Sequence, residues 1–368
     1  MQNKKIGVIT SSHSRNDTRI FLRQVSSLKK HFVVNFFVAD GLGDEKKENL
    51  IIKDLGKEKS RIKRFLFKPT VFLFHILKEK IDIVHIHDPE LLLIVIPLKI
   101  FRKKIIFDSH EDYSAAIKDR PYLKENLRPI IGNTFYFFEK FIVKFIDIII
   151  GATPFIKEKF NYHANPLLIA NYPSKHDLYK PKEDYIKTNQ VTYVGNMSEE
   201  RGIFHLVDAM GSIKKPIKLN LVGSFSEEDF ELKVKKLKGF QNVNFLGVKN
   251  RKEVGEILRR SFAGIVTFLP RENHINAQPN KLFEYFSVGI PVICSNFPLW
   301  KKIIRHEFGF SVNPEDASEI AEKIEFLYEN QKDKGYKMGL LAQQEYLKRY
   351  NWESEEKKLI DLYDSLLK

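Results

Sequence analysis

Short apolar runs alternate with longer amphipathic segments along the first half of the chain. The runs cover residues 5–10, 32–39, 81–86, 104–108 and 146–152. Several of them are apolar along their whole length, as expected of parallel strands that are covered on both faces. Asp17 or Thr18 can cap a helix that extends to about Lys30. This alternation predicts a doubly wound α/β sheet.

The same alternation restarts after a polar segment that contains Pro173 and Pro181. Its apolar runs cover residues 190–195, 217–222, 243–246, 262–268, 291–294 and 309–312. We therefore expect two Rossmann-like domains, at residues 1–172 and 186–349, joined by a linker at 173–185. A last amphipathic helix, at residues 352–368, is expected to pack back on the first domain. Two such domains would face a central cleft, because α/β folds bind ligands at the carboxyl ends of their strands.

Composition narrows the function classes. The single cysteine, Cys294, excludes a disulfide within the chain. The longest apolar stretch is too short to span a membrane and no signal peptide is visible, so we expect a cytoplasmic protein. Residues 1–175 hold 31 Lys and Arg against 19 Asp and Glu, which is most of the net charge of +14. A basic first half favours nucleic acid, anionic lipid or a phosphorylated acceptor as partner.

The segment from Asn276 to Val292 contains the most informative chemistry. It follows an apolar run and leads through a helix into another strand, so the helix N-terminus offers free N–H groups to a diphosphate. Lys281 opposes the helix dipole unless an anion is bound there. Glu284, one turn later, can accept hydrogen bonds from sugar or ribose hydroxyls. The alternative is an ordinary helix start with a solvated Lys and Glu.

This segment resembles the signature of retaining glycosyltransferase family 4, the group 1 glycosyltransferases with the GT-B fold. Its Pro279-Asn-Lys-Leu-Phe-Glu-Tyr is similar to a branch of that family in bacterial surface-polysaccharide biosynthesis. The likeness continues over nearly the whole chain in the family's order. The further matching motifs are Asn16-Asp-Thr-Arg-Ile-Phe, His85-Ile-His-Asp-Pro, Phe107-Asp-Ser-His-Glu-Asp, Tyr193-Val-Gly-Asn, Glu200-Arg-Gly and Tyr350-Asn-Trp-Glu.

The resemblance implies a donor site in the second domain. Glu284 matches the family's ribose-binding Glu, whereas Asn276 stands where the family has a Glu that contacts the sugar. Arg201 matches a phosphate-binding cation, and Asn196 replaces a second one. The implied catalytic residues are His110, Arg201, Lys281 and Glu284, with His110 orienting the sugar. The implied donor-binding residues are Gly195, Asn196, Gly202, Gly223, Val248, Asn276, Gln278, Asn280 and Leu282.

The acceptor side is assigned to the first domain. Its candidate residues are Arg15, Asn16, Asp17, Arg19 and His87. Arg15 or Arg19 would hold an acceptor phosphate, or else Asp17 simply caps the helix and pairs with an arginine. His87 and Asp88 would support the cleft, or have a purely structural role. The histidines lie at different strand ends without metal-ligand spacing, and no Asp-x-Asp motif occurs. We therefore expect a reaction without a metal or cofactor.

The expected activity is retaining transfer of a hexose-type sugar from a nucleotide sugar to an acceptor in surface polysaccharide (O-antigen or capsule) biosynthesis. The leaving phosphate itself can accept the proton. Aromatic and basic residues interleave at 51–74 and 134–147. This pattern fits peripheral contact with the anionic inner face of the cytoplasmic membrane and a polyprenyl-diphosphate-linked acceptor. The alternative is that these aromatic residues are core.

Three other functions are compatible with parts of the sequence. A nucleotide-sugar epimerase would bind the donor without a second substrate. A catalytically degenerate GT-B protein would act as a membrane-associated partner in a polysaccharide assembly complex, which the changes at Asn276 and Asn196 would allow. Nucleic-acid binding fits the pI near 9.4, but no nucleic-acid motif is found, so we expect no nucleic-acid partner.

Overall fold

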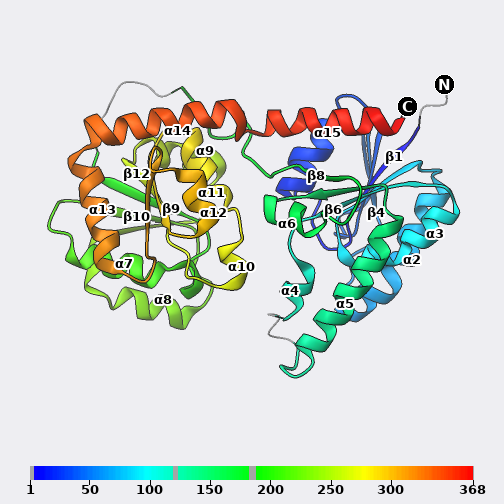
Figure 1. Ribbon diagram of the computed structural model, residues 1–368, viewed down its shortest axis with the longest axis horizontal. Helices are drawn as coiled ribbons and strands as arrows, with labels where there is room; N and C mark the ends of the chain where they lie inside the picture. The colour runs from blue at the N-terminus through cyan, green and yellow to red at the C-terminus, as the bar shows by residue number, and fades with distance from the viewer. Residues whose placement is uncertain (1–3, 119–122, 182–187, 368) are drawn as a thin grey trace. The chain divides into compact units, whose positions relative to one another are not determined.

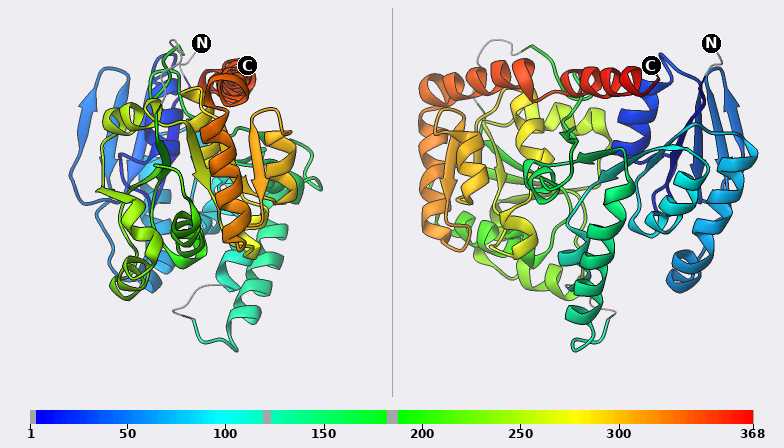
Figure 2. Two further views of the ribbon diagram at one scale, coloured as in Figure 1. Left: turned by 90° about the vertical axis from the view of Figure 1, so that its left-hand side faces the viewer. Right: turned by 45° about the vertical axis from the view of Figure 1, so that its right-hand side comes forward.

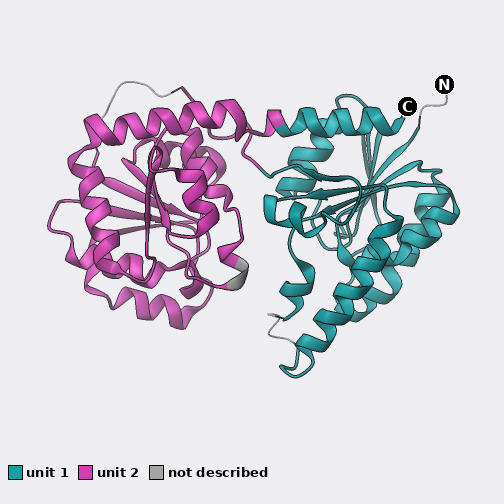
Figure 3. Ribbon diagram, in the orientation of Figure 1, with its two compact units in different colours: residues 1–171, 355–368 teal, residues 172–354 magenta. Residues whose placement is uncertain are grey.

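The protein divides into two compact units, which a computed structural model describes over residues 4–118, 123–181 and 188–367. Unit 1 comprises residues 1–171 and 355–368, and unit 2 comprises residues 172–354 (Figure 3). Each unit is a sheet with helices on both faces (Figures 1 and 2). The expected doubly wound α/β class is therefore confirmed for both units.

Unit 1 contains an eight-stranded sheet among its described residues, in the order β3-β4-β2-β1-β5-β6-β7-β8. All of its pairings are parallel except the antiparallel pair of β3 and β4. The strands are β1 (Ile6–Ile9), β2 (Val34–Val38), β3 (Glu45–Lys47), β4 (Leu50–Asp54), β5 (Ile83–Ile86), β6 (Lys104–Ser109), β7 (Ile148–Gly151) and β8 (Pro166–Leu168). Every residue of β1, β2 and β5 is buried, which accounts for their continuous apolar runs.

The helices of unit 1 cover this sheet. They are η1 (Thr18–Val25), α1 (Ser26–Leu28), α2 (Arg61–Lys78), η2 (Pro89–Ile94), α3 (Val95–Ile100), α4 (Tyr113–Lys118), α5 (Arg128–Ile142), η3 (Val143–Phe145), α6 (Pro154–Lys159) and most of α15 (Trp352–Leu367). The helix expected from Asp17 to Lys30 is present, but its first part is a π-helix. Asp17 caps it by accepting hydrogen bonds from the N–H groups of Arg19 and Ile20.

Unit 2 contains a six-stranded parallel sheet among its described residues, in the order β11-β10-β9-β12-β13-β14. Its strands are β9 (Gln190–Val194), β10 (Lys218–Val222), β11 (Val243–Gly247), β12 (Ala263–Val266), β13 (Val292–Ser295) and β14 (Gly309–Val312). Its helices are η4 (Glu199–Arg201), α7 (Ile203–Ser212), α8 (Glu228–Lys235), η5 (Lys238–Asn242), α9 (Arg251–Arg259), α10 (Glu272–Ile275), α11 (Asn280–Ser287), α12 (Pro298–Ile304), α13 (Ala317–Glu329), η6 (Gln331–Gly335) and α14 (Tyr336–Arg349).

Strand order locates the switch point of each sheet, where the chain direction across the sheet reverses. In unit 1 this point lies between β1 and β5, and in unit 2 it lies between β9 and β12. Loops diverge there at the carboxyl ends of the strands, so open α/β sheets bind their ligands at these points. The candidate site residues of each unit lie in these loops or in the strand ends and helices next to them.

The segment expected to link the domains is in part well packed. Tyr172 and Pro173 are buried within unit 2, where the carbonyl of Pro173 accepts hydrogen bonds from the Trp352 N–H and the Tyr346 hydroxyl. The end of the expected linker and the start of the expected second domain, residues 182–187, lie outside the described residues.

Candidate functional site

Two cationic side chains converge at the switch point of unit 2. Arg201 ends η4, and its guanidinium carbon lies 4.2 Å from the ring centroid of Phe268. The Lys281 ammonium, from the first turn of α11, lies 5.4 Å from the same centroid. Within the described part of unit 2, neither cation forms an ion pair with a carboxylate. We call Arg201 and Lys281 the cation pair.

The electrostatics of Lys281 reflect this arrangement. Its burial, together with the neighbouring charge of Arg201, lowers the pKa of the Lys281 ammonium to about 8. The residue N-terminal to α11 is Pro279, which provides no side-chain cap for the helix. The N–H groups of the first turn therefore add a positive partial charge beside two unpaired cations. Such a site favours an anion with at least two negative oxygens.

Three glycines beside the cation pair allow the backbone to lie close to neighbouring groups. Gly195 follows β9 with a φ of 137°, and a side chain there would collide with Lys281, whose Cε lies 2.5 Å from the Cβ position. Gly223 follows β10 with a φ of 140°, and its Cβ position lies 2.0 Å from the carbonyl oxygen of Gly195. Gly202 has a φ of 70° and packs against the carbonyl of Thr267. Only glycine fits these three positions without strain.

Glu284 lies one turn after Lys281 and is held by an arginine. Arg251, at the start of α9, donates from Nη1 to Glu284 Oε1 at 2.7 Å, and its Nη2 lies 3.7 Å from Asp177 Oδ2. Arg251 was not expected from the sequence, because it lies 33 positions from Glu284. Phe268, whose ring contacts both cations, was not expected at the site either. An aromatic residue at the end of an apolar strand predicts only a core residue.

The remaining donor-site candidates are dispersed around this centre. Asn196 donates to the Ser226 hydroxyl at 2.8 Å, so its amide closes a turn. Asn276 follows α10 and is exposed, as is Asn280 at the start of α11. Val248 is 76% exposed. The other two candidates are Gln278, of intermediate exposure, and Leu282, which is fully buried.

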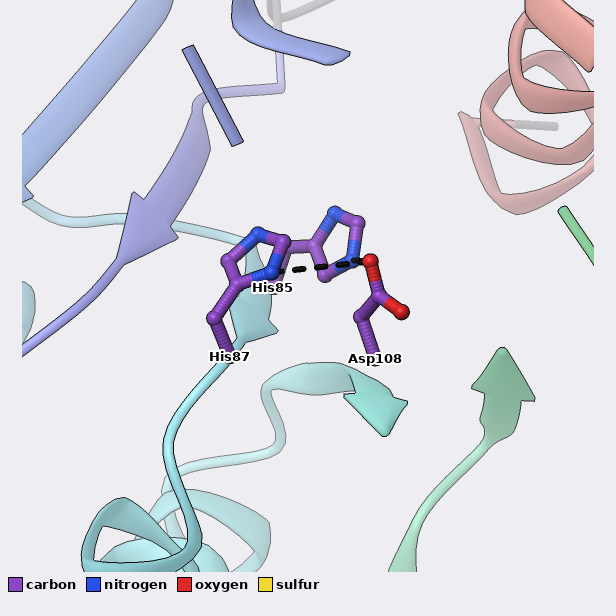
Figure 4. Close-up of side chains that lie close together, drawn as sticks. All are labelled: His85, His87 and Asp108. Carbon is purple, nitrogen blue, oxygen red and sulfur yellow. Dashed lines mark ion pairs between the residues drawn. The ribbon is translucent and has the colours of Figure 1, made fainter. Parts of the chain in front are cut away.

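In unit 1, three histidines converge on a buried carboxylate. His85 lies in β5, one residue before its end, and His87 directly follows the strand. Asp108 is the second-last residue of β6, and His110 directly follows β6. Asp108 Oδ2 lies 4.0 Å from His85 Nε2, 3.5 Å from His87 Nδ1 and 3.7 Å from His110 Nε2. Figure 4 shows His85 and His87 directed toward the carboxylate. We call these four residues the histidine cluster.

Asp108 is ionised in this cluster. Burial would raise the pKa of its carboxyl, but the charge of Arg19 and the hydrogen bonds around it hold the pKa well below the ordinary value. Arg19 donates to both oxygens, from Nε at 3.0 Å and Nη2 at 2.7 Å, and Gln24 donates at 2.6 Å. Burial lowers the pKa of His85 to about 4, so that imidazole is neutral at pH 7.

His85, His87 and Asp108 also have the composition of a metal site, because one ligand atom of each lies within 4.8 Å of the others. This convergence was not expected from the spacing of the histidines along the sequence, and that expectation was wrong, because the adjacent strands β5 and β6 bring the residues together. The donor set nevertheless does not fit a metal ion. Both oxygens of Asp108 already accept hydrogen bonds from the Arg19 guanidinium. A metal ion bound to Asp108 would have to displace this guanidinium or lie beside its positive charge.

The structure argues against two of the acceptor-site candidates. Arg15 and Arg19 are each more than nine-tenths buried. Arg15 donates to both oxygens of Asp40, and Arg19 donates to both oxygens of Asp108. Neither guanidinium is therefore free for an acceptor phosphate. Of the alternative, the helix cap by Asp17 is present, but the arginines pair with Asp40 and Asp108 and not with Asp17. Asn16 in the same loop is exposed.

His87 and His110 are placed as neighbours by the two strands. His87 Nδ1 lies 3.2 Å from His110 Nε2, and His87 is fully buried while His110 retains partial exposure. The expected supporting role of His87 remains a prediction, as does contact between His110 and a sugar.

Comparison with known proteins agrees with the fold. Residues 176–341 match the family described as glycosyl transferases group 1. No curated protein sequence matches the chain. The structure resembles a sucrose-phosphate synthase from Thermosynechococcus elongatus, with a TM-score of 0.75 and 18% identity over 99% of each chain.

Two further solved structures are similar over the whole length. A glycosyltransferase from Rickettsia africae has a TM-score of 0.75 and 15% identity over 100% of each chain. The Anabaena protein HepE, in complex with UDP, has a TM-score of 0.73 and 14% identity over 98% of this chain and 100% of its own. The chain thus has the GT-B fold, and the residues of its second unit match the group 1 glycosyltransferase family.

Proposed function

We propose that the protein transfers a sugar from a nucleotide-sugar donor, bound by unit 2, to a hydroxyl of an acceptor bound by unit 1. The observation that carries this proposal is the cation pair. Two cations with no carboxylate partner among the described residues lie on one aromatic ring, at the switch point of a sheet, beside an uncapped helix N-terminus. A diphosphate satisfies both charges and the free N–H groups at once.

Other features support a nucleotide diphosphate in particular. Glycines at 195 and 223 allow a ligand to approach the ends of β9 and β10, as phosphate-binding loops require. Glu284 offers a carboxylate to ribose hydroxyls. HepE, which has a similar fold, was solved in complex with UDP and in complex with UDP-glucose. We infer that the leaving diphosphate is stabilised by the cation pair as charge develops on it.

The test is calorimetric binding of UDP-, GDP-, dTDP- and ADP-glucose to the purified protein. We expect one nucleotide class to bind, and Arg201→Ala and Lys281→Ala each to weaken that binding about 10–100-fold, since a hydrogen bond to a charged group contributes about 1.5–3 kcal/mol. Lys302→Ala, an exposed cation on α12, is the matched control and should leave the affinity unchanged. Absence of binding by any nucleotide sugar to the folded protein would overturn the proposal and favour the non-catalytic partner.

We further propose that transfer retains the anomeric configuration and needs no divalent cation, because the cation pair already balances the diphosphate. NMR of the product identifies the anomer, and it also separates transfer from epimerisation, which would release an altered nucleotide sugar. Addition of EDTA should leave the transfer rate unchanged. Loss of activity in EDTA that Mg²⁺ restores would contradict the metal-free mechanism.

We propose that unit 1 contacts an anionic membrane surface and binds a lipid-linked acceptor there. Phe67 and Phe74, seven residues apart on one face of α2, are 63% and 61% exposed, and Phe137 on α5 is 68% exposed. The α2 segment carries five Lys and Arg and no Asp or Glu. Exposed aromatic rings among cations are typical of surfaces that contact anionic lipid. Among the described residues, no helix has the length and apolar character needed to cross a membrane.

Not every residue of the two expected patches belongs to this surface. Phe72 and Phe135 are core residues, as the alternative interpretation held for all of them. Lys53 pairs with Asp44, and Lys68 donates to the carbonyls of Leu55 and Gly56. Sedimentation with lipid vesicles tests whether the exposed aromatic residues contact the membrane. The double variant Phe67→Ser, Phe74→Ser should bind vesicles containing phosphatidylglycerol several-fold less than the wild type. Equal binding by the variant, or no preference over neutral phosphatidylcholine vesicles, would contradict the membrane contact.

A further inference from the structure

We propose that His13 and Asp88 form a proton-accepting pair in which His13 Nε2 takes the proton of the acceptor hydroxyl during transfer. This inference rests on the proposed function and deepens it, because it assigns the general base of the reaction to unit 1. His13 was not among the residues expected from the sequence. The pair lies at the switch point of unit 1, where β1 pairs with β5 and the loops after the two strands meet.

The loop after β1 is folded around the Asp88 carboxylate. Asp88 is buried, and its Oδ2 accepts from the Ser11 N–H at 2.6 Å and from the Thr10 hydroxyl at 2.7 Å. The Ser12 hydroxyl donates to the other oxygen, Oδ1. His13 Nδ1 lies 3.0 Å from the same Oδ1. The carboxylate is thus fixed by the loop and in turn orients the imidazole.

This geometry determines which nitrogen of His13 can act as a base. A carboxylate only accepts hydrogen bonds, and the Thr10 and Ser12 hydroxyls, 3.3 and 3.4 Å from Nδ1, both donate to Asp88, so Nδ1 carries the proton that is directed at Asp88. In the neutral imidazole the lone pair is then on Nε2. The His13 side chain is 32% exposed whereas Asp88 is buried, so the pair combines an accessible imidazole with an enclosed carboxylate. His110, the residue expected to contact the sugar, has its ring centroid 5.3 Å from that of His13.

The charges that surround His13 favour proton uptake. Burial alone would lower the pKa of its imidazole, but the hydrogen bond and charge of Asp88 outweigh burial, and Asp17 and Glu90 add to the effect. The pKa of His13 is therefore raised above its ordinary value. His110 is the other titratable group that faces the ring. A base with a pKa near the working pH is the most effective proton acceptor.

The step is balanced as follows. The acceptor O–H bond breaks and its proton forms the Nε2–H bond of His13, while the hydroxyl oxygen bonds to the anomeric carbon. The bond from that carbon to the phosphate oxygen breaks, and its electron pair leaves with the nucleoside diphosphate. Asp88 stabilises the imidazolium, which then releases the proton to water. In this step His13 accepts the proton in place of the leaving phosphate, which is the other group that can accept it.

The experiment compares His13→Ala with the wild type in two assays of the full chain. Calorimetry gives the affinity for the nucleotide sugar that binds, and release of the free nucleotide with water as acceptor gives the reaction rate. We expect the rate to fall about 10²–10⁴-fold, the usual contribution of a general base, with the donor affinity changed less than about twofold. Added imidazole should restore part of the rate. His31→Ala, an exposed histidine of unit 1, is the matched control.

The pH profile provides the diagnostic readout. The wild-type rate should fall as the pH drops below the pKa of His13, and this acidic limb should be absent from His13→Ala. A rate within threefold of the wild type, with donor affinity intact, would overturn the base assignment and leave the proposed function standing. Failure of the wild type to bind any nucleotide sugar would instead overturn the proposed function.

A second measurement applies if water proves too poor an acceptor to give a rate. The pKa of His13 is then read from the pH titration of its ring-proton NMR signal, in the wild type and in Asp88→Asn. A wild-type pKa at or below that of free imidazole would refute the pair. A raised pKa that returns to the ordinary value in Asp88→Asn supports it.

Discussion

The titration of Lys281 predicts how donor binding depends on pH. In the free protein the pKa of this ammonium is lowered from 10.5 to about 8 by burial and by Arg201. A bound diphosphate places negative charge beside it and should return the pKa toward its ordinary value. Because the pKa is depressed only in the free state, affinity is full below pH 8 and decreases as the pH rises above 8. The protonated fraction falls about tenfold between pH 7 and pH 9, so the affinity should also fall about tenfold, or about 1.4 kcal/mol.

The assay is calorimetry of the nucleotide sugar at pH 7, 8 and 9, in two buffers that differ in ionisation enthalpy. At pH 9 the buffer dependence of the heat should report uptake of about one proton on binding. Lys281→Arg keeps the charge but does not titrate in this range, so its affinity should be independent of pH. A wild-type affinity that is constant from pH 7 to pH 9, or an equal slope in Lys281→Arg, would refute the reasoning.

Three further predictions concern stability, each measured by urea unfolding. Arg19→Met leaves Asp108 as a buried charge without its main partner and should cost about 3–5 kcal/mol; a loss below 1 kcal/mol would show that the carboxyl is neutral. Gly223→Ala combines a φ of 140° with a Cβ only 2.0 Å from the Gly195 carbonyl oxygen, so we expect at least about 2 kcal/mol of destabilisation, and unchanged stability would contradict this backbone geometry. Tyr363→Phe removes the 2.9 Å hydrogen bond to a buried imidazole nitrogen and should cost about 1–3 kcal/mol, whereas a stabilised variant would show that the bond is absent.

The central strands of both sheets were predictable from the sequence, whereas the two edge strands of unit 1, β3 and β8, and β4 next to β3 were not. Strands such as β1 and β5 are buried on both faces and so are continuously apolar. By contrast, β3 is Glu45–Lys47 and exposes two lysines, because it pairs with β4 on one side only. Its pairing with β4 is a local hairpin in which Lys47 lies opposite Leu50, but a three-residue strand of charged residues leaves no apolar pattern in the sequence. At the other edge, β8 (Pro166–Leu168) is apolar, but three residues are too few to show the pattern of a strand.

The residue types of the candidate site were predictable, but most of the partners were not. A helix start with Lys281 and Glu284 is visible in a local window, whereas Arg251 and Phe268 reach it from other elements. The pairing of Arg19 with Asp108 could not be predicted from the sequence, since 89 positions separate the two residues and only the sheet brings them together. His13 was overlooked because its significance depends entirely on Asp88, which is 75 positions away.

Unit 1 is assembled from both ends of the sequence, and this has a consequence for synthesis on the ribosome. The hydroxyl of Tyr363 on α15 contacts a buried histidine of β5, and the Glu355 carboxylate accepts from the Ala170 N–H. Both contacts must wait until the 183 residues of unit 2 have been translated. At about 5–20 residues per second, this delay is about 10–40 s. The nascent first unit therefore has to persist with part of its apolar surface uncovered, and unit 2, although later in the sequence, has all of its strands available before unit 1 can close.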